Sequence, residues 1–140
     1  MRKCRIVSGA RDSGKTSYIS ALGISQGIIT LSENPEKNTR YLSCLSDGTK
    51  HDFMTRMNGR YVVSEGAFEW AHEKLSRIGS GIAAIDECGM IELREKRGFH
   101  DSITALMEKE EVTLYVSVRD AFLPLFLSVF APDEYDVIML

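Results

Sequence analysis

Long apolar runs are absent from this sequence of 140 residues, and no stretch approaches the length needed to span a membrane. The most apolar stretch, 121–131, contains Pro124 and has only the length of a buried helix. The basic start at Arg2 is followed by an apolar segment that ends at Arg11, too early for a signal peptide. We therefore expect neither a membrane partner nor a secretory leader.

Cysteine is also scarce, with residues only at Cys4, Cys44 and Cys88. The number is odd, and no two of them have the two-residue spacing of a metal knuckle or a redox pair. A disulfide scaffold is therefore excluded. The expected location is the reducing cytoplasm.

An excess of either charge is lacking too, since 17 Lys and Arg face 20 Asp and Glu, for a net charge of −3. Such a surface does not attract a polyphosphate chain, so no nucleic acid is expected as a partner. With only 3 prolines and 11 glycines, the chain is neither disordered nor fibrous. Two domains would each be too small to bury a core, so we expect a single domain over 1–140.

Short β-branched segments alternate with segments of helical periodicity, which is typical of an α/β fold. The expected architecture is a mostly parallel sheet with helices on both faces. Strands are expected at 4–8, 27–31, 40–45, 61–63, 81–85, 112–118 and 135–139. Helices are expected at 14–22, from Ser64 as N-cap to 79, around 99–107 and from Pro124. Turn residues at 33–35 are compatible with a hairpin of the second and third strands, and Asp47-Gly48 predicts the next turn.

The most specific motif follows the first expected strand. Segment 9–16, Gly-Ala-Arg-Asp-Ser-Gly-Lys-Thr, matches the phosphate-loop pattern Gly-x-x-x-x-Gly-Lys-Ser/Thr between a strand and a helix. Backbone N–H groups of such a loop converge on a β-phosphate. Lys15 then contacts the β- and γ-phosphates, and the Thr16 hydroxyl is a ligand for Mg²⁺. The residues expected to bind nucleotide are Gly9, Ala10, Arg11, Asp12, Ser13, Gly14, Lys15, Thr16 and Ser17.

Two carboxylates follow another buried strand. Asp86 and Glu87 come directly after the apolar run 82–85, so a parallel strand would bring them to the edge that carries the phosphate loop. There Asp86 would hold Mg²⁺ opposite Thr16, and Glu87 would orient the water that attacks the γ-phosphate. The alternative for such an acidic pair is a solvated loop.

A cation follows the next strand. Arg119 leaves segment 112–118 at the same expected edge, where its guanidinium can stabilise charge on the γ-phosphate. The alternative is a salt bridge with Asp120 or another nearby acid. The candidate catalytic residues are therefore Lys15, Glu87 and Arg119. Further cations expected at this edge, or on a merely solvated face, are Arg11, Arg94, Lys96 and Arg97.

Several segments resemble the small P-loop nucleoside-triphosphatase family, which includes the cancer-related nucleoside-triphosphatase and its bacterial and archaeal relatives. Besides the phosphate loop, the most specific is 85–93, Ile-Asp-Glu-Cys-Gly-Met-Ile-Glu-Leu. The others are 27–30, 40–41, 47–48, 59–61 and 67–68, so the resemblance covers most of the chain. Cys88 stands where an apolar residue is expected.

The resemblance implies a RecA-like sheet with an additional strand and a catalytic glutamate, a role that falls to Glu87. It also implies slow hydrolysis, with Mg²⁺ as cofactor, of nucleoside triphosphates such as ATP and GTP to diphosphate and phosphate. Glu92 is the next candidate for the catalytic carboxylate. A kinase is one alternative, with 32–60 near the acceptor and 94–97 as a lid. The other is a binding module whose contact with a protein partner is reset by hydrolysis.

Overall fold

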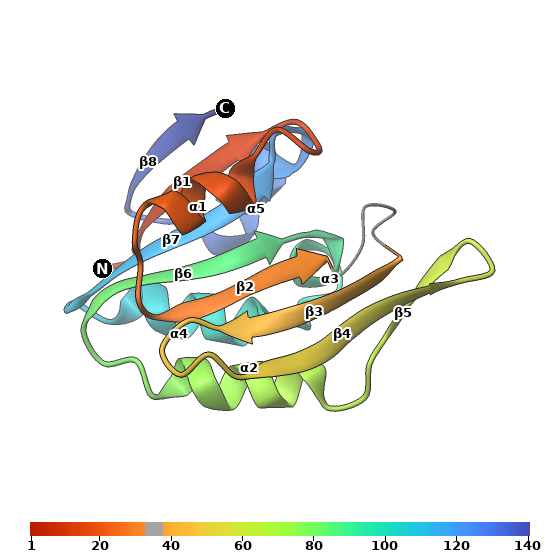
Figure 1. The fold of residues 1–140 in the computed structure, drawn as a ribbon. Helices are drawn as coiled ribbons and strands as arrows, with labels where there is room; N and C mark the ends of the chain where they lie inside the picture. Colours follow the sequence, from red (N-terminus) through yellow and green to blue (C-terminus); the bar gives the residue numbers. More distant parts are fainter. Residues whose placement is uncertain (33–37) are drawn as a thin grey trace.

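The computed structural model describes residues 1–32 and 38–140, and one sheet of eight strands runs through them (Figure 1). The strand order is β5-β4-β3-β2-β6-β7-β1-β8. The strands are β1 Lys3–Gly9, β2 Gly27–Ser32, β3 Thr39–Cys44, β4 Lys50–Met57, β5 Arg60–Val63, β6 Gly81–Cys88, β7 Val112–Arg119 and β8 Glu134–Met139. The helices are α1 Lys15–Ala21, α2 Ala67–Ser76, α3 Met90–Leu93, α4 His100–Glu108, the 3₁₀ turn η1 Asp120–Phe122 and α5 Leu123–Phe130.

The five strands β2, β6, β7, β1 and β8 are parallel to one another. Strands buried on both faces need continuous apolar sequence, which explains the runs that end at Ile85 and Val118. Strand β7 lies between β1, which leads into the phosphate loop, and β6, which ends in the acidic pair. The mostly parallel α/β sheet and its additional strand are thereby confirmed.

The other three strands extend the sheet in antiparallel fashion. β2 pairs with β3, as expected of a hairpin, and β4 and β5 continue the meander. The expected turn at 33–35 lies outside the described residues. The turn at Asp47 is present, and the Thr49 N–H and hydroxyl both donate to the Asp47 carboxylate, at 2.9 and 2.6 Å.

Strand β4 was not expected, because only Phe53 along it is buried and its sequence has neither an apolar run nor a regular alternation. A register shift in its pairing with β3, between Arg40 and Tyr41, further breaks the pattern. Its place in the sheet is determined by pairing with both neighbours, which residue type alone does not reveal.

The helices cover the two faces of the sheet unequally. Figure 1 shows α1 on one side of the sheet and α2 and α4 on the other. The larger apolar core contains residues of α2, α4 and α5 together with the facing residues of the strands. The smaller core, under α1, consists of Val7, Ile19, Ile29, Ala84 and Tyr115. Helices on both faces are thus confirmed. Cys88 is buried in the larger core, so it fills the apolar position expected there.

One helix prediction needs correction, and one helix was not predicted. The N-cap of α2 is Gly66 and not Ser64, whose carbonyl instead accepts a bond from the Ala67 N–H. The four-residue helix α3 was not expected, because a single turn is too short to produce a helical period. Among the described residues, none of the helices has the length and apolar character needed to cross a bilayer.

Candidate functional site

A pocket of about 460 Å³ lies at the carboxyl ends of β1, β7, β6 and β2. It brings together the phosphate loop, the acidic pair and the cation that were expected at this edge. Its lining residues are Arg11, Asp12, Ser13, Gly14, Lys15, Thr16, Ser17, Thr30, Ser32, Arg40, Tyr61, Asp86, Glu87 and Arg119.

The phosphate loop connects β1 to α1. Gly14, the N-cap of α1, has a φ of 94°, a left-handed conformation that strains any residue with a Cβ. Lys15 is 6% exposed, and its Nζ donates to the carbonyl oxygens of Gly9 and Ala10 at 3.3 and 2.9 Å. The carbonyl groups of Gly9 and Ala10 therefore hold the Lys15 ammonium group without lining the pocket themselves. Residues 11–17 line the pocket. The Ser13 hydroxyl is buried and finds no hydrogen-bond partner within the described part of the chain.

Asp86 is 1% exposed and lies where β6 becomes irregular. Between the pairs Ile85–Val116 and Cys88–Val118, two residues of β6, Asp86 and Glu87, lie opposite a single residue of β7. This extra residue is a bulge, a feature that redirects the side chains next to it. The bulge therefore lies at the acidic pair.

Asp86 accepts hydrogen bonds from one helix, α1, and from two strands, β7 and β2. The hydroxyl of Thr16 donates to its Oδ2 at 2.7 Å, and the hydroxyl of Ser117 donates to its Oδ1. Thr30 donates its hydroxyl to the Asp86 carbonyl at 2.7 Å. Burial raises the pKa of Asp86 above its ordinary value, and the hydrogen bonds from Ser117 and Thr16 oppose that rise.

These groups fit a magnesium ion. Thr16 and Asp86 present a hydroxyl and a carboxylate oxygen side by side, both of the hard oxygen type that Mg²⁺ selects. Mg²⁺ usually takes only one or two ligands from the protein and completes its shell with phosphate oxygens and water. The two residues expected to bind the metal are therefore adjacent and chemically suitable.

Glu87 lines the pocket and, unlike Asp86, is exposed to solvent. The pKa of its carboxyl is raised, first because the walls of the pocket partly desolvate it and second because the Asp86 carboxylate is close. Positive charges of Lys15, Arg40 and Arg119 oppose the shift. All three cations line the same pocket as Glu87.

Arg119 is the last residue of β7 and pairs in register with Gly9 of the phosphate loop. Its guanidinium lies 5.1 Å from the centre of the Phe122 ring. Within residues 1–32 and 38–140, the structure records no ion pair between Arg119 and Asp120, the alternative considered from sequence.

Glu92 does not line this pocket. It is 4% exposed, and its two carboxylate oxygens accept hydrogen bonds from the N–H groups of Gly89 and Phe99, at 2.8 and 3.1 Å. A Cβ at Gly98 would lie 2.0 Å from Glu92 Oε2, so the glycine makes room for this carboxylate. Glu92 is therefore a backbone-binding residue and not a candidate for contact with water at the γ-phosphate.

The cationic segment 94–97 does not line the pocket, which favours the solvated face, one of the two alternatives considered from sequence. Arg94, Lys96 and Arg97 are exposed, and Arg97 pairs with Glu95 at 3.6 Å. They follow α3, which turns the chain away after the acidic pair.

Four lining residues were not predicted as site residues: Thr30, Ser32, Arg40 and Tyr61. Thr30 and Ser32 occupy the end of β2, beside β6 in the sheet, and β2 was an expected strand. The strand order, which no local pattern reveals, puts them next to the acidic pair. Arg40 and Tyr61 come from the antiparallel extension.

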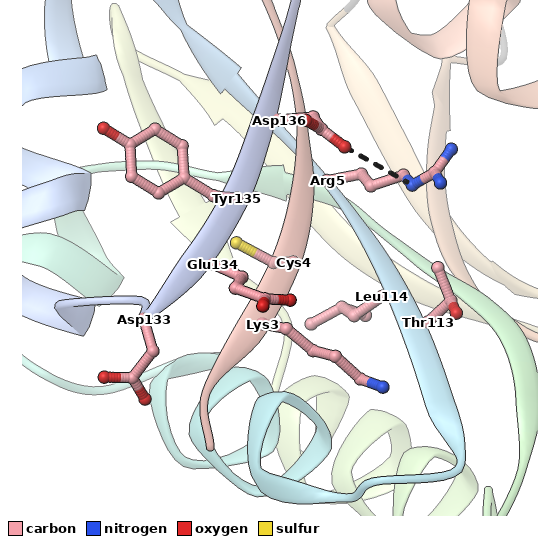
Figure 2. Close-up of a pocket in the computed structure, with 9 residues that line it drawn as sticks. All are labelled: Lys3, Cys4, Arg5, Thr113, Leu114, Asp133, Glu134, Tyr135 and Asp136. Carbon is pink, nitrogen blue, oxygen red and sulfur yellow. Dashed lines mark ion pairs between the residues drawn. The ribbon is translucent and has the colours of Figure 1, made fainter.

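A second cavity, of about 500 Å³, lies at the opposite ends of β1, β7 and β8 (Figure 2). It is lined by Lys3, Cys4, Arg5, Thr113, Leu114, Asp133, Glu134, Tyr135 and Asp136. Figure 2 shows an ion pair across it between Arg5 and Asp136, at 3.9 Å. None of the motif residues reaches it, so its slightly larger volume does not make it the better candidate.

Comparison with known proteins bears on the fold. No protein-family model and no curated protein matches the chain. A solved structure of THEP1 from the hyperthermophile Aquifex aeolicus is similar at a TM-score of 0.73 and 20% identity, over 98% of this chain and 89% of that one. A human cancer-related nucleoside triphosphatase is similar at a TM-score of 0.72 and 18% identity, over 99% of this chain and 88% of that one.

The chain has the fold of small P-loop nucleoside triphosphatases. The resemblance first noted in segments such as 85–93 is thereby confirmed for the fold, over nearly the whole chain. At 18–20% identity the likeness extends to architecture alone, so any activity has to be argued from the side chains of the pocket.

Proposed function

We propose that this protein binds a nucleoside triphosphate with Mg²⁺ at the phosphate loop and hydrolyses it to diphosphate and phosphate. The observation that carries the proposal is the 2.7 Å contact between the Thr16 hydroxyl and the Asp86 carboxylate. These residues are 70 positions apart and belong to the two motifs that triphosphate hydrolysis requires.

Phosphate binding falls to residues 11–17. The Lys15 side chain is already held by its hydrogen bonds to the loop carbonyl groups. Little side-chain entropy therefore remains to be lost when it contacts the β- and γ-phosphates. The buried Ser13 hydroxyl without a partner in the described residues is consistent with an acceptor supplied by a ligand.

The metal is proposed at Thr16 and Asp86. When bound there, Mg²⁺ would neutralise charge that develops on the phosphate oxygens. Ser117 and Thr30 keep the Asp86 carboxylate and carbonyl in fixed positions through their hydroxyl groups. Such partners of a ligand set its orientation and strengthen the site.

Glu87 is the proposed general base. It lies next to Asp86 in the pocket and is exposed enough to contact a water molecule. A carboxylate whose pKa is raised accepts a proton more readily than an ordinary one. Arg119, at the end of the neighbouring strand, is the proposed stabiliser of negative charge in the transition state.

A kinase has less support than a hydrolase. The segment considered as its cationic lid, 94–97, does not line the pocket. A nucleotide-gated binding module would use the same pocket, and it is distinguished by a partner whose affinity differs between the triphosphate and diphosphate states.

The test is to incubate the protein with ATP or GTP and Mg²⁺ and to follow free phosphate, with and without nucleoside and sugar acceptors. We expect release without an acceptor. Lys15→Ala should abolish turnover and weaken triphosphate binding, since no neighbour in the loop replaces its charge. Hydrolysis by Lys15→Ala at the parental rate would overturn the assignment, and phosphate transfer to an acceptor would favour the kinase.

We also propose a reducing compartment, such as the cytoplasm, for the protein. Its three cysteines are free and buried. Burial raises the pKa of the Cys4 thiol to about 12, which keeps it protonated and unreactive.

A further inference from the structure

Arg40 is a cation of the pocket that the proposed mechanism does not use. It lies on β3 opposite Ser32 of β2, and its side chain lines the same pocket as the phosphate loop. The strand order β1-β7-β6-β2-β3 places it on the far side of the acidic pair from the loop. Arg119 of β7 and Arg40 of β3 therefore approach Glu87 from opposite directions along the edge.

The Arg40 guanidinium is held against an aromatic ring. Its central carbon lies 5.2 Å from the centre of the Tyr61 ring, within the range of a cation–π interaction. Tyr61 comes from β5, two strands beyond β3, and it lines the pocket as well. The ring limits the rotamers of a long side chain, so less entropy is lost when the guanidinium binds a ligand.

One donor of this guanidinium has no acceptor within the described part of the chain. Arg40 Nε is buried and has no hydrogen-bond partner among residues 1–32 and 38–140. A buried charged donor that stays unpaired is costly, so its position suggests an acceptor that arrives with a ligand. Arg40 and Glu87 line the same pocket.

The nature of that acceptor follows from the order of groups along the pocket. The loop on β1 takes the β-phosphate, and Asp86 and Glu87 come next toward the end of the phosphate chain. Arg40 lies beyond them, on β3, and lines the same pocket. A guanidinium fork matches the oxygens of a phosphate, whereas a nucleobase or a ribose offers it no charge.

We propose that Arg40, stacked on Tyr61, binds the γ-phosphate and makes the pocket selective for triphosphate over diphosphate. This inference rests on the proposed function, because it requires the nucleotide to lie with its phosphates along the loop. The antiparallel extension β3–β5 thereby becomes part of the nucleotide site and is more than an enlargement of the sheet.

The experiment compares two ligands, each with Mg²⁺: ADP and the β,γ-imido analogue of ATP, which resists hydrolysis. Dissociation constants are measured by calorimetry for the parent and for Arg40→Ala. We expect Arg40→Ala to weaken the triphosphate analogue about 10- to 100-fold, the usual worth of a hydrogen bond to a charged group, and to leave ADP within about threefold. Arg40→Lys should fall between, since it keeps the charge but not the fork.

The matched control is Arg60→Ala, which removes an exposed arginine of β5 that does not line the pocket and should change neither constant. Melting temperatures establish that each variant is folded. Equal losses for ADP and the analogue, or no loss for either, would overturn the role of Arg40 while leaving hydrolysis intact. Failure of the proposed function has a different signature: the parent releases no phosphate, or Lys15→Ala binds the analogue as well as the parent.

Discussion

At the scale of the residue, Asp86 and Glu87 are neighbours in sequence with opposite environments. Asp86 is nearly inaccessible and accepts bonds from Ser117 and Thr16, whereas Glu87 is exposed in the pocket. A held carboxylate suits a metal ligand, and an accessible one suits contact with water. The bulge in β6 lies at these two residues.

Glu87→Gln should separate binding from chemistry, because glutamine keeps the shape of the side chain but cannot accept a proton. We expect triphosphate affinity to be unchanged or higher, since a carboxylate that repels the γ-phosphate is lost. The single-turnover rate should fall by roughly 10² to 10⁴, the usual contribution of a positioned base. Glu95→Gln, at an exposed site outside the pocket, is the matched control. A parental rate in Glu87→Gln would remove Glu87 from the mechanism.

Residues of the site were predictable where a strand leads directly into them. Lys15, Asp86 and Arg119 each follow an apolar run, and parallel strands bring their ends to one edge. Arg40 was not predicted as a ligand, because its place depends on the pairing of β3 with β2 and on a ring from β5. Pairing between strands is a property of the whole sheet and leaves no local signal.

At the scale of the element, an ion pair joins the turn between β3 and β4 to α2. Lys74 of α2 donates to the Asp47 carboxylate at 2.8 Å and also lies over the Trp70 ring, 5.8 Å from its centre. The bond from Lys74, followed by those from Thr49, holds the pKa of Asp47 well below its ordinary value of 3.8. The antiparallel extension is therefore joined to a helix of the larger core.

Asp47→Asn should lower stability in a pH-dependent way. Because the folded-state pKa is depressed, the carboxylate stabilises the fold above the unfolded pKa near 3.8, and this contribution is lost as the pH falls toward the folded value. Urea unfolding should therefore show a larger difference between parent and variant at pH 7 than at pH 3. Asp52→Asn, on the exposed side of β4, is the control. A difference that stays constant with pH would mean that the pair contributes nothing through charge.

Elements differ in how well the sequence predicts them. The seven strands with β-branched or apolar runs were expected, and each is present within a few residues of its predicted bounds. Both β4 and α3 escaped prediction for a shared physical reason: they are stabilised by neighbours and not by their own periodicity. In β4 only Phe53 is buried. In α3 the Glu92 carboxylate accepts a hydrogen bond from the N–H group of Gly89, which lies just before the helix.

At the scale of the whole molecule, the layers on the two faces of the sheet are unequal. Among the described residues, α2, α3, α4 and α5 all contribute to the larger core on one face, where α4 alone buries Ile103, Leu106 and Met107. On the other face α1 buries a single large apolar side chain, Ile19, against the smaller core. The phosphate loop leads directly into α1, so the proposed ligand-binding segment belongs to the thinner layer.

Amide hydrogen exchange should report this asymmetry. Opening α1 exposes little apolar surface, so its amide protons should exchange about tenfold faster or more than those of α4 without global unfolding. Bound Mg²⁺ with the imido analogue of ATP should slow exchange most in the loop and α1. Equal protection of α1 and α4 in the free protein would contradict this. In the expected case, α1 is the helix that opens most readily in the free protein, and bound nucleotide restores its order. Slower amide exchange in α1 would therefore report that the nucleotide site is occupied.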